Sequence, residues 1–417
     1  MEYGCIGEKL GHSFSKIIHN ELADYNYELC EVARENLSDF IKKADFKAIN
    51  VTIPYKEAVI PFLYKIDDTA KKIGAVNTIV NKDGKLYGYN TDFLGLSALI
   101  IREKIFLKGK KVLILGSGGT SKTAFAVAES MEASVIYRVS RSAGKGLITY
   151  AEAYKKHNDA EVIINTTPCG MYPNIGKTAI DIAKFPKLCG VVDAVYNPLD
   201  SALVTKAKSM GISAAGGLYM LVSQAAFAIE KFINVKIDIS DTQRVYRKLL
   251  NEKRNLVLVG MPGCGKTTLG KALSKKLSKE FIDTDEEIVK KTGIAIPEIF
   301  TIYGEAAFRK IESEVIAEIS LKQNCVIATG GGAVLNGCNV ELLKENGIII
   351  FIDKPLEMLV TTSDRPLSSN RKLLEKRYNE RYDIYVSSAN AVIKASNNLN
   401  SDIKAVEEGY LNEIFSS

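Results

Sequence analysis

The chain has 417 residues, of which 46% are hydrophobic and 25% are charged, and its formal net charge at pH 7 is +6. These values are typical of a globular protein of two or three domains, and they argue against disorder, collagen-like repeats and an integral membrane protein. The charge is too dilute, and the lysines and arginines too dispersed, for a nucleic-acid-binding protein, so we expect small anionic ligands as partners.

The cysteine pattern and the apolar stretches bear on the compartment. The seven cysteines are scattered and form no Cys-x-x-Cys pair, which favours reduced thiols. The N-terminal residues show no basic region followed by an apolar one, so we expect no secretory signal. The most apolar stretch, residues 216–233, carries Ser223 and Gln224 near its middle and is predicted to be a buried helix instead of a membrane span. We therefore expect a cytoplasmic protein without a membrane partner, and the sequence does not indicate its oligomeric state.

Strand-like and helix-like segments alternate along the chain, which is typical of an α/β fold with parallel sheets. Residues 76–91 differ, because alternating segments flank Lys82-Asp83-Gly84 and predict a hairpin. Continuous apolar runs of strand length predict strands buried on both faces. These runs lie at residues 47–53, 110–116, 133–139, 160–167, 189–195, 255–260, 324–330 and 347–353.

Composition also suggests where the domains divide. Residues 233–254 are polar and charged, and a fresh apolar strand begins at residue 255, so we place the main boundary near residue 250. A second boundary, between residues 92 and 100, follows the first group of strands. We predict domains over residues 1–95, 96–235 and 254–417, a linker over 236–253, and a closing helix near 216–233 that packs back on the first domain.

A glycine turn between a strand and a helix suggests a dinucleotide site. Residues 110–130 read KKVLILGSGGTSKTAFAVAES, with Gly116 and Gly118 at the first two positions of G-x-G-x-x-G and Ser121 at the third. Glycines there let backbone N–H groups approach a pyrophosphate at the helix N-terminus, although a plain tight turn is the alternative. The next strand ends in Ser140-Arg141-Ser142 without an acidic residue, and an arginine favours the 2′-phosphate of NADP over NAD unless it is an ordinary surface charge.

Polar motifs at strand ends extend over the first half of the chain. They read GEKLGHSFSKIIHN (7–20), NVTIPYK (50–56), AVNTIV (75–80), YNTDF (89–93), INTTPCGM (164–171), DAVYNP (193–198) and GGLYMLVSQAA (216–226). In this order they closely resemble shikimate dehydrogenase over residues 1–232. The resemblance implies a substrate-binding domain over residues 1–95 and a Rossmann-type NADP domain over 96–235.

The resemblance also implies roles for matching residues. Lys56 and Asp92 would be the catalytic pair, because reduction of a ketone leaves an alkoxide that an ammonium beside a carboxylate can protonate. A surface salt bridge is the alternative. The substrate would be held by Ser13 and Ser15 at its carboxylate, by Thr52, Asn77 and Gln224 at its ring hydroxyls, and by Tyr196. NADP(H) would be held by Gly116, Ser117, Gly118, Gly119, Thr120, Ser140, Arg141, Ser142, Lys145 and Gly217.

Two departures from the family pattern concern this half. Lys9 and Lys16 stand where the family often has proline, which affects only the rigidity of that loop. The interval from Arg141 to residue 160 is shorter than usual, so the grip on NADP is less well defined by the resemblance than the catalytic pair.

Residues 260–267 read GMPGCGKT after an apolar run and fit G-x-x-x-x-G-K-S/T through Gly260, Gly265, Lys266 and Thr267. Glycines are needed because backbone N–H groups must point inward around phosphates. Lys266 would reach the β- and γ-phosphates, and Thr267 would ligate Mg²⁺.

The segment EFIDTDEEI follows this loop along the chain. It places Asp283 and Asp285 two residues apart, which predicts that both lie on one face at a strand's end. Asp283 could then serve the Mg²⁺ shell, and Asp285 could accept a hydrogen bond from an attacking hydroxyl.

Further motifs complete a second resemblance. GEAAFRKIE supplies Arg309, CVIATGGGAV supplies three glycines and DRPLS supplies Arg365, and with GMPGCGKT they closely resemble shikimate kinase over residues 254–417. The resemblance implies that Arg309 and Arg381 clamp the substrate carboxylate, that Gly330, Gly331 and Gly332 face the ring, and that Arg365 lies on a lid. ATP would be held by Gly260, Gly263, Cys264, Gly265, Lys266, Thr267 and Thr268, and Mg²⁺ by Thr267 and Asp283. The usual proline near Arg381 and a basic lid residue before Arg365 are absent.

We therefore expect a bifunctional enzyme that reduces 3-dehydroshikimate with NADPH and phosphorylates shikimate with MgATP. One half's product would be the other's substrate. Two alternatives remain open: a quinate/shikimate dehydrogenase that uses NAD fused to a kinase, or a chain in which one half is degenerate and regulatory. A nucleic-acid-linked P-loop protein is disfavoured, because no basic stripe or aromatic platform is evident.

Overall fold

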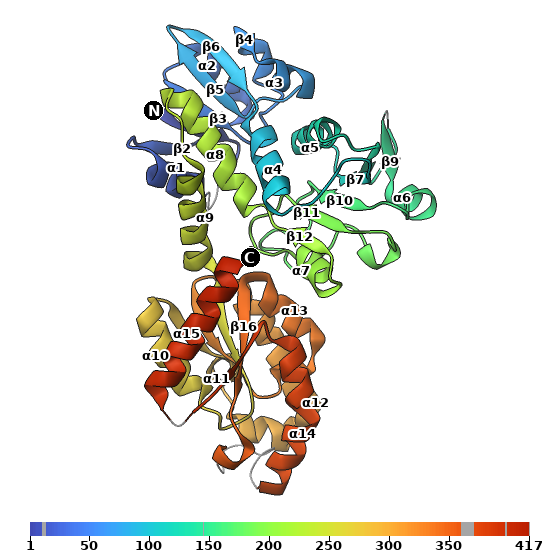
Figure 1. Cartoon of the computed structure of the whole chain (residues 1–417). Helices are drawn as coiled ribbons and strands as arrows, with labels where there is room; N and C mark the ends of the chain where they lie inside the picture. Colours follow the sequence, from blue (N-terminus) through green and yellow to red (C-terminus); the bar gives the residue numbers. More distant parts are fainter. Residues whose placement is uncertain (11–13, 145, 360–370, 397, 417) are drawn as a thin grey trace. The chain divides into compact units, whose positions relative to one another are not determined.

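The computed structural model describes residues 1–10, 14–144, 146–359, 371–396 and 398–416. Its contacts divide the chain into two compact units (Figure 1). Unit 1 comprises Met1–Met171 and Lys177–Tyr246, and unit 2 comprises Tyr172–Gly176 and Arg247–Ser417. Both units consist of mainly parallel sheets with helices, so the predicted α/β fold is confirmed.

The first sheet of unit 1 is mixed, with the order β2-β1-β3-β5-β6-β4 in the described residues. β1 pairs in parallel with β2 and β3, whereas β5 is antiparallel to both β3 and β6. The predicted hairpin is confirmed, because Asp83 and Gly84 turn the chain between β5 and β6 with φ of 53° and 80°. The strands are β1 (Tyr3–Gly7), β2 (Tyr27–Glu31), β3 (Ala48–Val51), β4 (Lys65–Ile66), β5 (Thr78–Lys82) and β6 (Lys85–Tyr89).

The second sheet of unit 1 is parallel between its named strands, with the order β12-β11-β10-β7-β8-β9. Its strands are β7 (Lys111–Leu115), β8 (Val135–Ser140), β9 (Leu147–Thr149), β10 (Val162–Asn165), β11 (Gly190–Asp193) and β12 (Ser213–Ala215). The predicted burial is confirmed for β10 and β11, and for β7 after its first residue. It is wrong for β8, where only Val139 is buried, because β8 lies next to the three-residue edge strand β9 and receives little cover there.

The helices of unit 1 carry the site residues and the core. They are α1 (Ser15–Leu22), α2 (Leu37–Lys43), α3 (Asp68–Ile73), α4 (Thr91–Arg102), α5 (Gly119–Ser130), α6 (Tyr150–Lys156), α7 (Ala202–Ser209), α8 (Leu218–Ile233) and the first part of α9 (Ile239–Lys253). The prediction of a buried helix at residues 216–233 is confirmed by α8, which packs along α4 (Figure 1). No helix among the described residues is long and apolar enough to cross a membrane.

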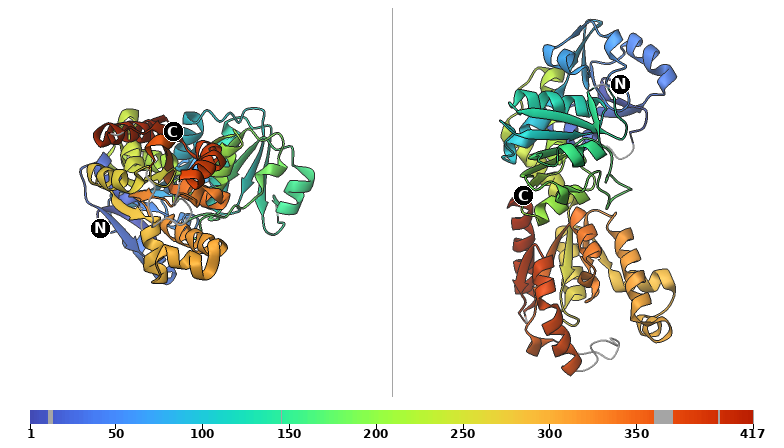
Figure 2. Two further views of the ribbon diagram at one scale, coloured as in Figure 1. Left: turned by 90° about the horizontal axis from the view of Figure 1, so that it is seen from below. Right: turned by 90° about the vertical axis from the view of Figure 1, so that its right-hand side faces the viewer.

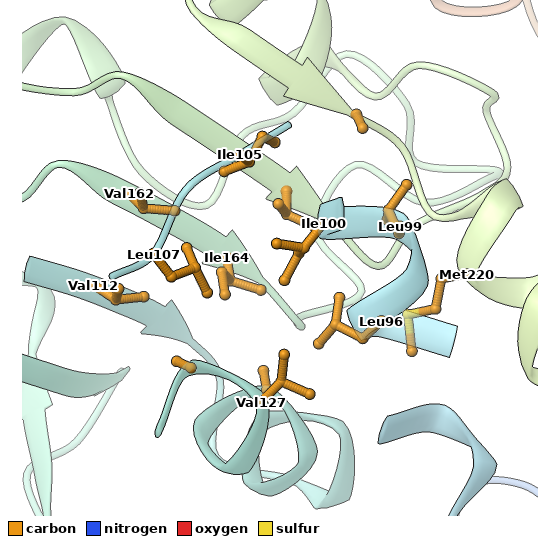
Figure 3. Packing of buried hydrophobic residues seen from close by; sticks show 14 of the residues in the cluster. Leu96, Leu99, Ile100, Ile105, Leu107, Val112, Val127, Val162, Ile164 and Met220 are labelled. Carbon is orange, nitrogen blue, oxygen red and sulfur yellow. The ribbon is translucent and has the colours of Figure 1, made fainter. Parts of the chain in front are cut away.

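Helix α4 connects the two sheets of unit 1. The side chain of Asn90 caps its start by accepting a hydrogen bond from Phe93 N, and Asp92 lies in its first turn. Farther along, Leu96 and Ile100 point into a buried cluster with side chains of β7 and β10 (Figure 3). Burial of a Leu or Ile side chain contributes about 1.5–3 kcal/mol to folding stability. The cluster therefore fixes the helix α4, and with it the position of Asp92 in the first turn. The proposed boundary at residues 95/96 therefore lies within a continuous helix.

Unit 2 has one sheet with the order β14-β15-β13-β16-β17, and its pairings are parallel in the described residues. Its strands are β13 (Asn255–Val259), β14 (Glu280–Asp283), β15 (Cys325–Ala328), β16 (Gly347–Asp353) and β17 (Ala391–Lys394). Helices cover the sheet, as the views in Figure 2 show. They are α10 (Lys266–Leu277), α11 (Thr284–Thr292), α12 (Ile296–Ile319), α13 (Gly337–Asn346), α14 (Arg371–Ser388) and α15 (Leu399–Ser416). The predicted burial of β13, β15 and β16 is confirmed.

The end of α9 is anchored in unit 2 by polar contacts. Lys279 Nζ donates hydrogen bonds to Asn251 O at 2.6 Å and to Arg254 O at 3.0 Å, and Tyr410 Oη donates to Arg254 O at 2.8 Å. These donors satisfy carbonyl groups that a helix end leaves without intrahelical partners. All seven cysteines of the chain are free, as the scattered spacing predicts.

Candidate active sites

Lys56 and Asp92 form an ion pair in unit 1. Lys56 follows β3 in a turn and Asp92 comes from the first turn of α4, and Lys56 Nζ lies 2.6 Å from Asp92 Oδ2. Their side chains are only 15% and 10% exposed, so this pair is more shielded from water than a surface salt bridge. Such a pair can hold an ammonium group next to a bound carbonyl.

Amide and hydroxyl groups from three elements meet in one hydrogen-bond network. Asn77 Oδ1 accepts from Thr91 N at 2.7 Å, and Asn77 Nδ2 donates to Thr91 Oγ1 at 3.0 Å. Gln224 Oε1, from α8, accepts from Thr91 Oγ1 at 3.4 Å and Asn77 Nδ2 at 3.5 Å. The structure thus brings together two predicted ring-hydroxyl ligands that are 147 residues apart. Thr91 was not among the residues predicted for this site, although it stands beside Asp92 in YNTDF.

The buried side chain of Asn50 makes further hydrogen bonds to residues of this network. Its Nδ2 donates to Thr78 Oγ1 at 3.2 Å and to Asn77 O at 3.3 Å, and its Oδ1 accepts from Tyr27 Oη at 2.7 Å. Both Tyr27 and Asn50 are buried, and burial raises the pKa of Tyr27 well above its usual value. Tyr27 therefore remains a neutral donor that fixes the orientation of the Asn50 amide.

The remaining predicted substrate residues lie on short segments. Thr52 follows β3, and its N–H donates to Ile6 O at 2.9 Å. Ser15 is the first residue of α1, and the ring of the preceding Phe14 packs against Tyr196 at 5.4 Å between centroids. Ser13 lies outside the described residues.

The predicted dinucleotide loop has the backbone that the glycines require. Gly116 has φ of +120°, which residues with a Cβ rarely adopt. A Cβ there would also lie 2.6 Å from Thr166 Oγ1, so both the backbone conformation and the contact disfavour a side chain. Gly118 is the N-cap of α5 without a side-chain cap, and a Cβ there would meet no atom within 4 Å. The first N–H groups of α5, over Gly119 and Thr120, thus lie next to open space at Gly118, and their binding of a pyrophosphate stays a prediction. A Cβ at Gly119 would lie 3.8 Å from Lys56 Cδ, so this loop, which includes Ser117, adjoins the Lys56–Asp92 ion pair.

The end of β8 presents basic and polar side chains to solvent. Ser140 ends the strand, and Arg141 and Ser142 are exposed. Arg141 has no hydrogen bond or ion pair with another described residue, and its binding of a 2′-phosphate stays a prediction. Lys145 lies outside the described residues.

A buried carboxylate shapes the loop that carries Tyr196. Asp193, at the end of β11, accepts hydrogen bonds from Ser201 Oγ at 2.6 Å, Asn165 Nδ2 at 2.9 Å and Val195 N at 3.0 Å. Burial raises the pKa of Asp193 to about 6. The predicted cofactor residue Gly217 packs against the same loop, where a Cβ would collide with the carbonyl oxygen of Ala194.

In unit 2, residues 260–267 form a glycine loop between β13 and α10. Gly260, Gly263 and Gly265 have φ of 149°, 82° and 97°, a region that residues with a Cβ rarely adopt. Lys266 Nζ folds back on this loop and donates to Gly260 O at 2.8 Å and to Met261 O at 3.0 Å. Gly265 is the N-cap of α10 without a side-chain cap, which leaves N–H groups for phosphates.

The predicted metal residues are in contact. Thr267 Oγ1 donates to Asp283 Oδ2 at 2.8 Å, so a hydroxyl and a carboxylate oxygen meet beside the glycine loop. Mg²⁺ usually takes one or two protein oxygens together with substrate phosphates, and this pair fits that pattern. Among the described residues, no group of three His, Cys, Asp or Glu side chains could hold a metal by itself.

Asp285 reaches this site from a helix and not from a strand. The expectation that Asp283 and Asp285 lie on one face at a strand's end is wrong, because β14 ends at Asp283 and Asp285 lies in the first turn of α11. Asp283 Oδ1 accepts from Asp285 N at 3.0 Å and caps α11. Both carboxylates still line one cavity of about 1030 Å³, together with Lys266, Thr267 and Thr268. Cys264, within the glycine loop of residues 260–267, is buried.

The three predicted glycines lie where a side chain would strike the site. A Cβ at Gly330 would lie 2.8 Å from Asp285 Oδ1 and from Glu312 Oε1, and one at Gly331 would lie 2.8 Å from the ring of Pro262. At Gly332 it would collide with the guanidinium of Arg309. Asp285, Glu312, Pro262 and Arg309 thus occupy the space that side chains at these three positions would need.

Arg309 and Arg381 line the same cavity. Arg309 Nη1 donates to Glu312 Oε2 at 2.7 Å, and Arg381 Nη1 donates to Gly331 O at 2.9 Å. Glu312 is 1% exposed, and burial raises its pKa. The motif reading missed Glu312, although its place three residues after Arg309 on a helix is the spacing of an ion pair. Arg365 lies outside the described residues.

Comparison with known proteins identifies both halves. Residues 5–79 match the family model of the shikimate dehydrogenase substrate-binding domain, and residues 262–411 match that of shikimate kinase. The chain is 40% identical over 265 residues to the NADP-dependent shikimate dehydrogenase of Clostridium perfringens, covering 59% of this chain and 97% of that protein.

Two solved structures resemble the same share of the chain. One is a chorismate mutase/shikimate 5-dehydrogenase fusion from Clostridium acetobutylicum, 36% identical with a TM-score of 0.56 over 59% of this chain and 96% of that one. The other is shikimate 5-dehydrogenase from Thermus thermophilus in complex with NADP(H) and shikimate, 27% identical with a TM-score of 0.53 over 60% of this chain and 99% of that one. The chain therefore belongs to the shikimate dehydrogenase family and joins to it a shikimate kinase domain, so that one polypeptide carries an NADP-dependent dehydrogenase and an ATP- and Mg²⁺-dependent kinase of the shikimate pathway.

Proposed function

We propose that the chain reduces 3-dehydroshikimate to shikimate with NADPH and then phosphorylates the 3-hydroxyl of shikimate with MgATP, two consecutive steps towards the aromatic amino acids. The observation that supports this most is that each half retains a full set of reacting groups. Unit 1 holds the Lys56–Asp92 pair, and unit 2 holds Lys266, the Thr267–Asp283 pair and Asp285 around one cavity. A degenerate half would not need to keep charged groups this well buried.

In the reduction, bound NADPH would supply a hydride to the carbonyl carbon. Lys56 would transfer a proton from Nζ to the oxygen, and the adjacent Asp92 carboxylate, 2.6 Å away, holds the Lys56 ammonium in position. Asn77, Gln224 and Thr52 would orient the ring by its hydroxyl groups. Ser13 and Ser15 would hold the carboxylate, and Tyr196 would cover the ring.

In the phosphorylation, Asp285 accepts a hydrogen bond from the attacking hydroxyl, and Lys266 moves from its loop carbonyls to the transferring phosphate. Thr267 and Asp283 would hold Mg²⁺, which would neutralise charge on the phosphates. Arg309 and Arg381 would hold the substrate carboxylate in a planar, bidentate geometry. Arg365 would complete the charge compensation at the phosphate.

A complementation assay tests both halves at once. Variants Lys56→Ala and Asp285→Asn are purified and supplied with 3-dehydroshikimate, NADPH and MgATP, and shikimate 3-phosphate is measured. Neither variant alone should form it. An equimolar mixture should, because free shikimate made by the second variant reaches the kinase half of the first.

Each half is also assayed separately. Lys56→Ala should reduce dehydroshikimate on the order of 100-fold more slowly or worse, while it phosphorylates supplied shikimate at the unmodified rate. A loss below about tenfold would rule out Lys56 as the proton donor. Faster oxidation of quinate with NAD than of shikimate with NADP would reassign the first half.

We also propose that the protein works in the cytoplasm, where NADPH and ATP are supplied and where its seven free thiols would stay reduced.

Its domains are proposed as residues 1–95, 96–235 and 254–417.

A further inference from the structure

Arg377 occupies an unusual place on helix α14. The buried residues of this helix include Leu374, Arg381 and Tyr385, whose spacing defines one face. Arg377 follows Leu374 by three positions and precedes Arg381 by four, so it lies on that same face. It is half-buried and lines the cavity that also contains Asp285. The neighbouring Lys376, in contrast, has a side chain that is 72% exposed and pairs with Glu380.

The other two guanidinium groups of this cavity already have protein partners. Arg309 binds Glu312 at 2.7 Å and Glu305 at 3.1 Å, and Arg381 donates to Gly331 O. Arg377 makes no hydrogen bond or ion pair with any described residue. A guanidinium has five N–H donors, so a half-buried one without acceptors is ready to bind an anion.

The charges of the cluster point to the same conclusion. The carboxylates of Glu305 and Glu312 are both paired with Arg309, and Arg377 has no ion pair with a described residue. Burial and the nearby charge of Arg381 lower the pKa of Arg377. A carboxylate on a ligand would supply hydrogen-bond acceptors for the Arg377 guanidinium.

The position of the cluster favours the acceptor substrate over the nucleotide. Arg309 packs against Gly332 and Arg381 bonds to Gly331, whereas Lys266 lies on the loop carbonyls at Gly260 and Met261. The arginines therefore gather on the side of the cavity formed by the second glycine run.

We propose that Arg377 binds the carboxylate of the kinase substrate together with Arg309 and Arg381, and thereby helps to select an anionic acceptor. This inference rests on the proposed kinase function. It adds a third carboxylate ligand, one turn before Arg381 on the same helix.

The test compares Arg377→Gln with Lys376→Gln, which removes the same charge from the solvent side of the same turn. KM is measured for ATP, for shikimate and for shikimate methyl ester, which keeps the ring hydroxyls but lacks the negative charge. Because a hydrogen bond to a charged group contributes about 1.5–3 kcal/mol, Arg377→Gln should raise KM for shikimate about 10- to 100-fold. KM for ATP and for the ester should stay within about twofold of the unmodified chain, and Lys376→Gln should change none of them.

Folding is controlled in the same samples. Each variant's melting temperature and dehydrogenase activity are measured, and Arg377→Lys, which keeps the charge but not the planar fork, should lose less affinity than Arg377→Gln. Equal losses for shikimate and its ester, or an equal rise in KM for ATP, would overturn the role of Arg377. An unchanged KM for shikimate would overturn it too and leave the proposed function standing. If the unmodified chain does not phosphorylate shikimate, the proposed function fails and the assignment of Arg377 fails with it.

Discussion

Replacing Gly332 by alanine would test how closely the glycine run is fitted to Arg309. Gly332 has φ of −111° and ψ of −3°, which alanine adopts without strain. The added Cβ would nevertheless lie under 3.0 Å from the Nη1, Cζ and Nη2 atoms of Arg309. The guanidinium would have to withdraw by about 1 Å or more to reach an ordinary contact distance.

A shift of that size would break the hydrogen bond of 2.7 Å from Arg309 to Glu312 and misalign the guanidinium. Losing a charged hydrogen bond to the substrate costs about 1.5–3 kcal/mol, so we expect KM for shikimate to rise about 10- to 100-fold. KM for ATP should change less than about twofold, because the three atoms nearest to the added Cβ all belong to Arg309 and none to the phosphate loop. Glu312, 1% exposed, would lose its cation, so the kinase unit should also melt at a lower temperature.

Kinase assays with saturating ATP measure the effect, and the dehydrogenase activity of the same preparation reports the amount of folded chain. Gly337→Ala is the matched control, because a Cβ there meets no atom within 4 Å, and it should leave both KM values unchanged. If Gly332 acts through Arg309, the double variant with Arg309→Lys should bind shikimate little worse than Arg309→Lys alone. Normal shikimate affinity in Gly332→Ala, or fully additive losses in the double variant, would refute the reasoning.

Three further predictions concern unit 1. Arg141→Asp should raise KM for NADPH and shift preference towards NADH, and an unchanged KM for NADPH would show that Arg141 does not bind the 2′-phosphate. The raised pKa of Asp193, about 6, means that the folded chain binds more protons than the unfolded one between about pH 4 and 6, so stability should fall as pH rises through that range. Asp193→Asn can keep all three hydrogen bonds without a charge and should remove this dependence. The measurement is the melting temperature as a function of pH, taken on the transition that NADPH shifts, because that transition reports the dehydrogenase half. Burial lowers the pKa of His19 to about 3, so the folded chain binds fewer protons than the unfolded one between pH 3 and 6.5 and stability should fall as pH drops through that range. His19→Phe should flatten that acid limb, and an unaltered limb would contradict the buried neutral imidazole.

Local patterns in the sequence were sufficient to predict much of the secondary structure and the identity of the two halves. The Asp83-Gly84 turn, the helix over residues 218–233 and the glycine loop before Lys266 depend on backbone conformations and hydrophobic periods that a short segment carries by itself. The same holds for the choice of residue types, because a phosphate loop needs glycines wherever the chain folds around phosphates.

Prediction was weaker where the outcome depended on neighbours along a sheet or at an element boundary. The apolar run that became β8 looks like any buried strand, but its exposure follows from its place beside the short edge strand β9. Asp285 stands two residues after Asp283, a spacing equally compatible with one strand face, yet the chain begins α11 between them. The burial of a strand and the residue at which it ends depend on packing against other parts of the chain, which a short stretch of sequence does not contain.

Only the tertiary structure decided which polar groups meet and why the glycines of the kinase half are glycines. Asn77 and Gln224, 147 residues apart, converge because α8 packs along α4, and Lys56 reaches Asp92 because the α4 helix is held by the core of the second sheet. The sequence predicts that Gly330, Gly331 and Gly332 face the substrate ring, and the fold adds that Asp285, Pro262 and Arg309 occupy the space of the missing side chains. Arg377 is one more charge on a polar helix in the sequence, and only the fold shows that it lines the cavity. Such contacts arise when segments far apart in the chain bury apolar surface together, so their geometry is a property of the packed molecule and not of any local pattern.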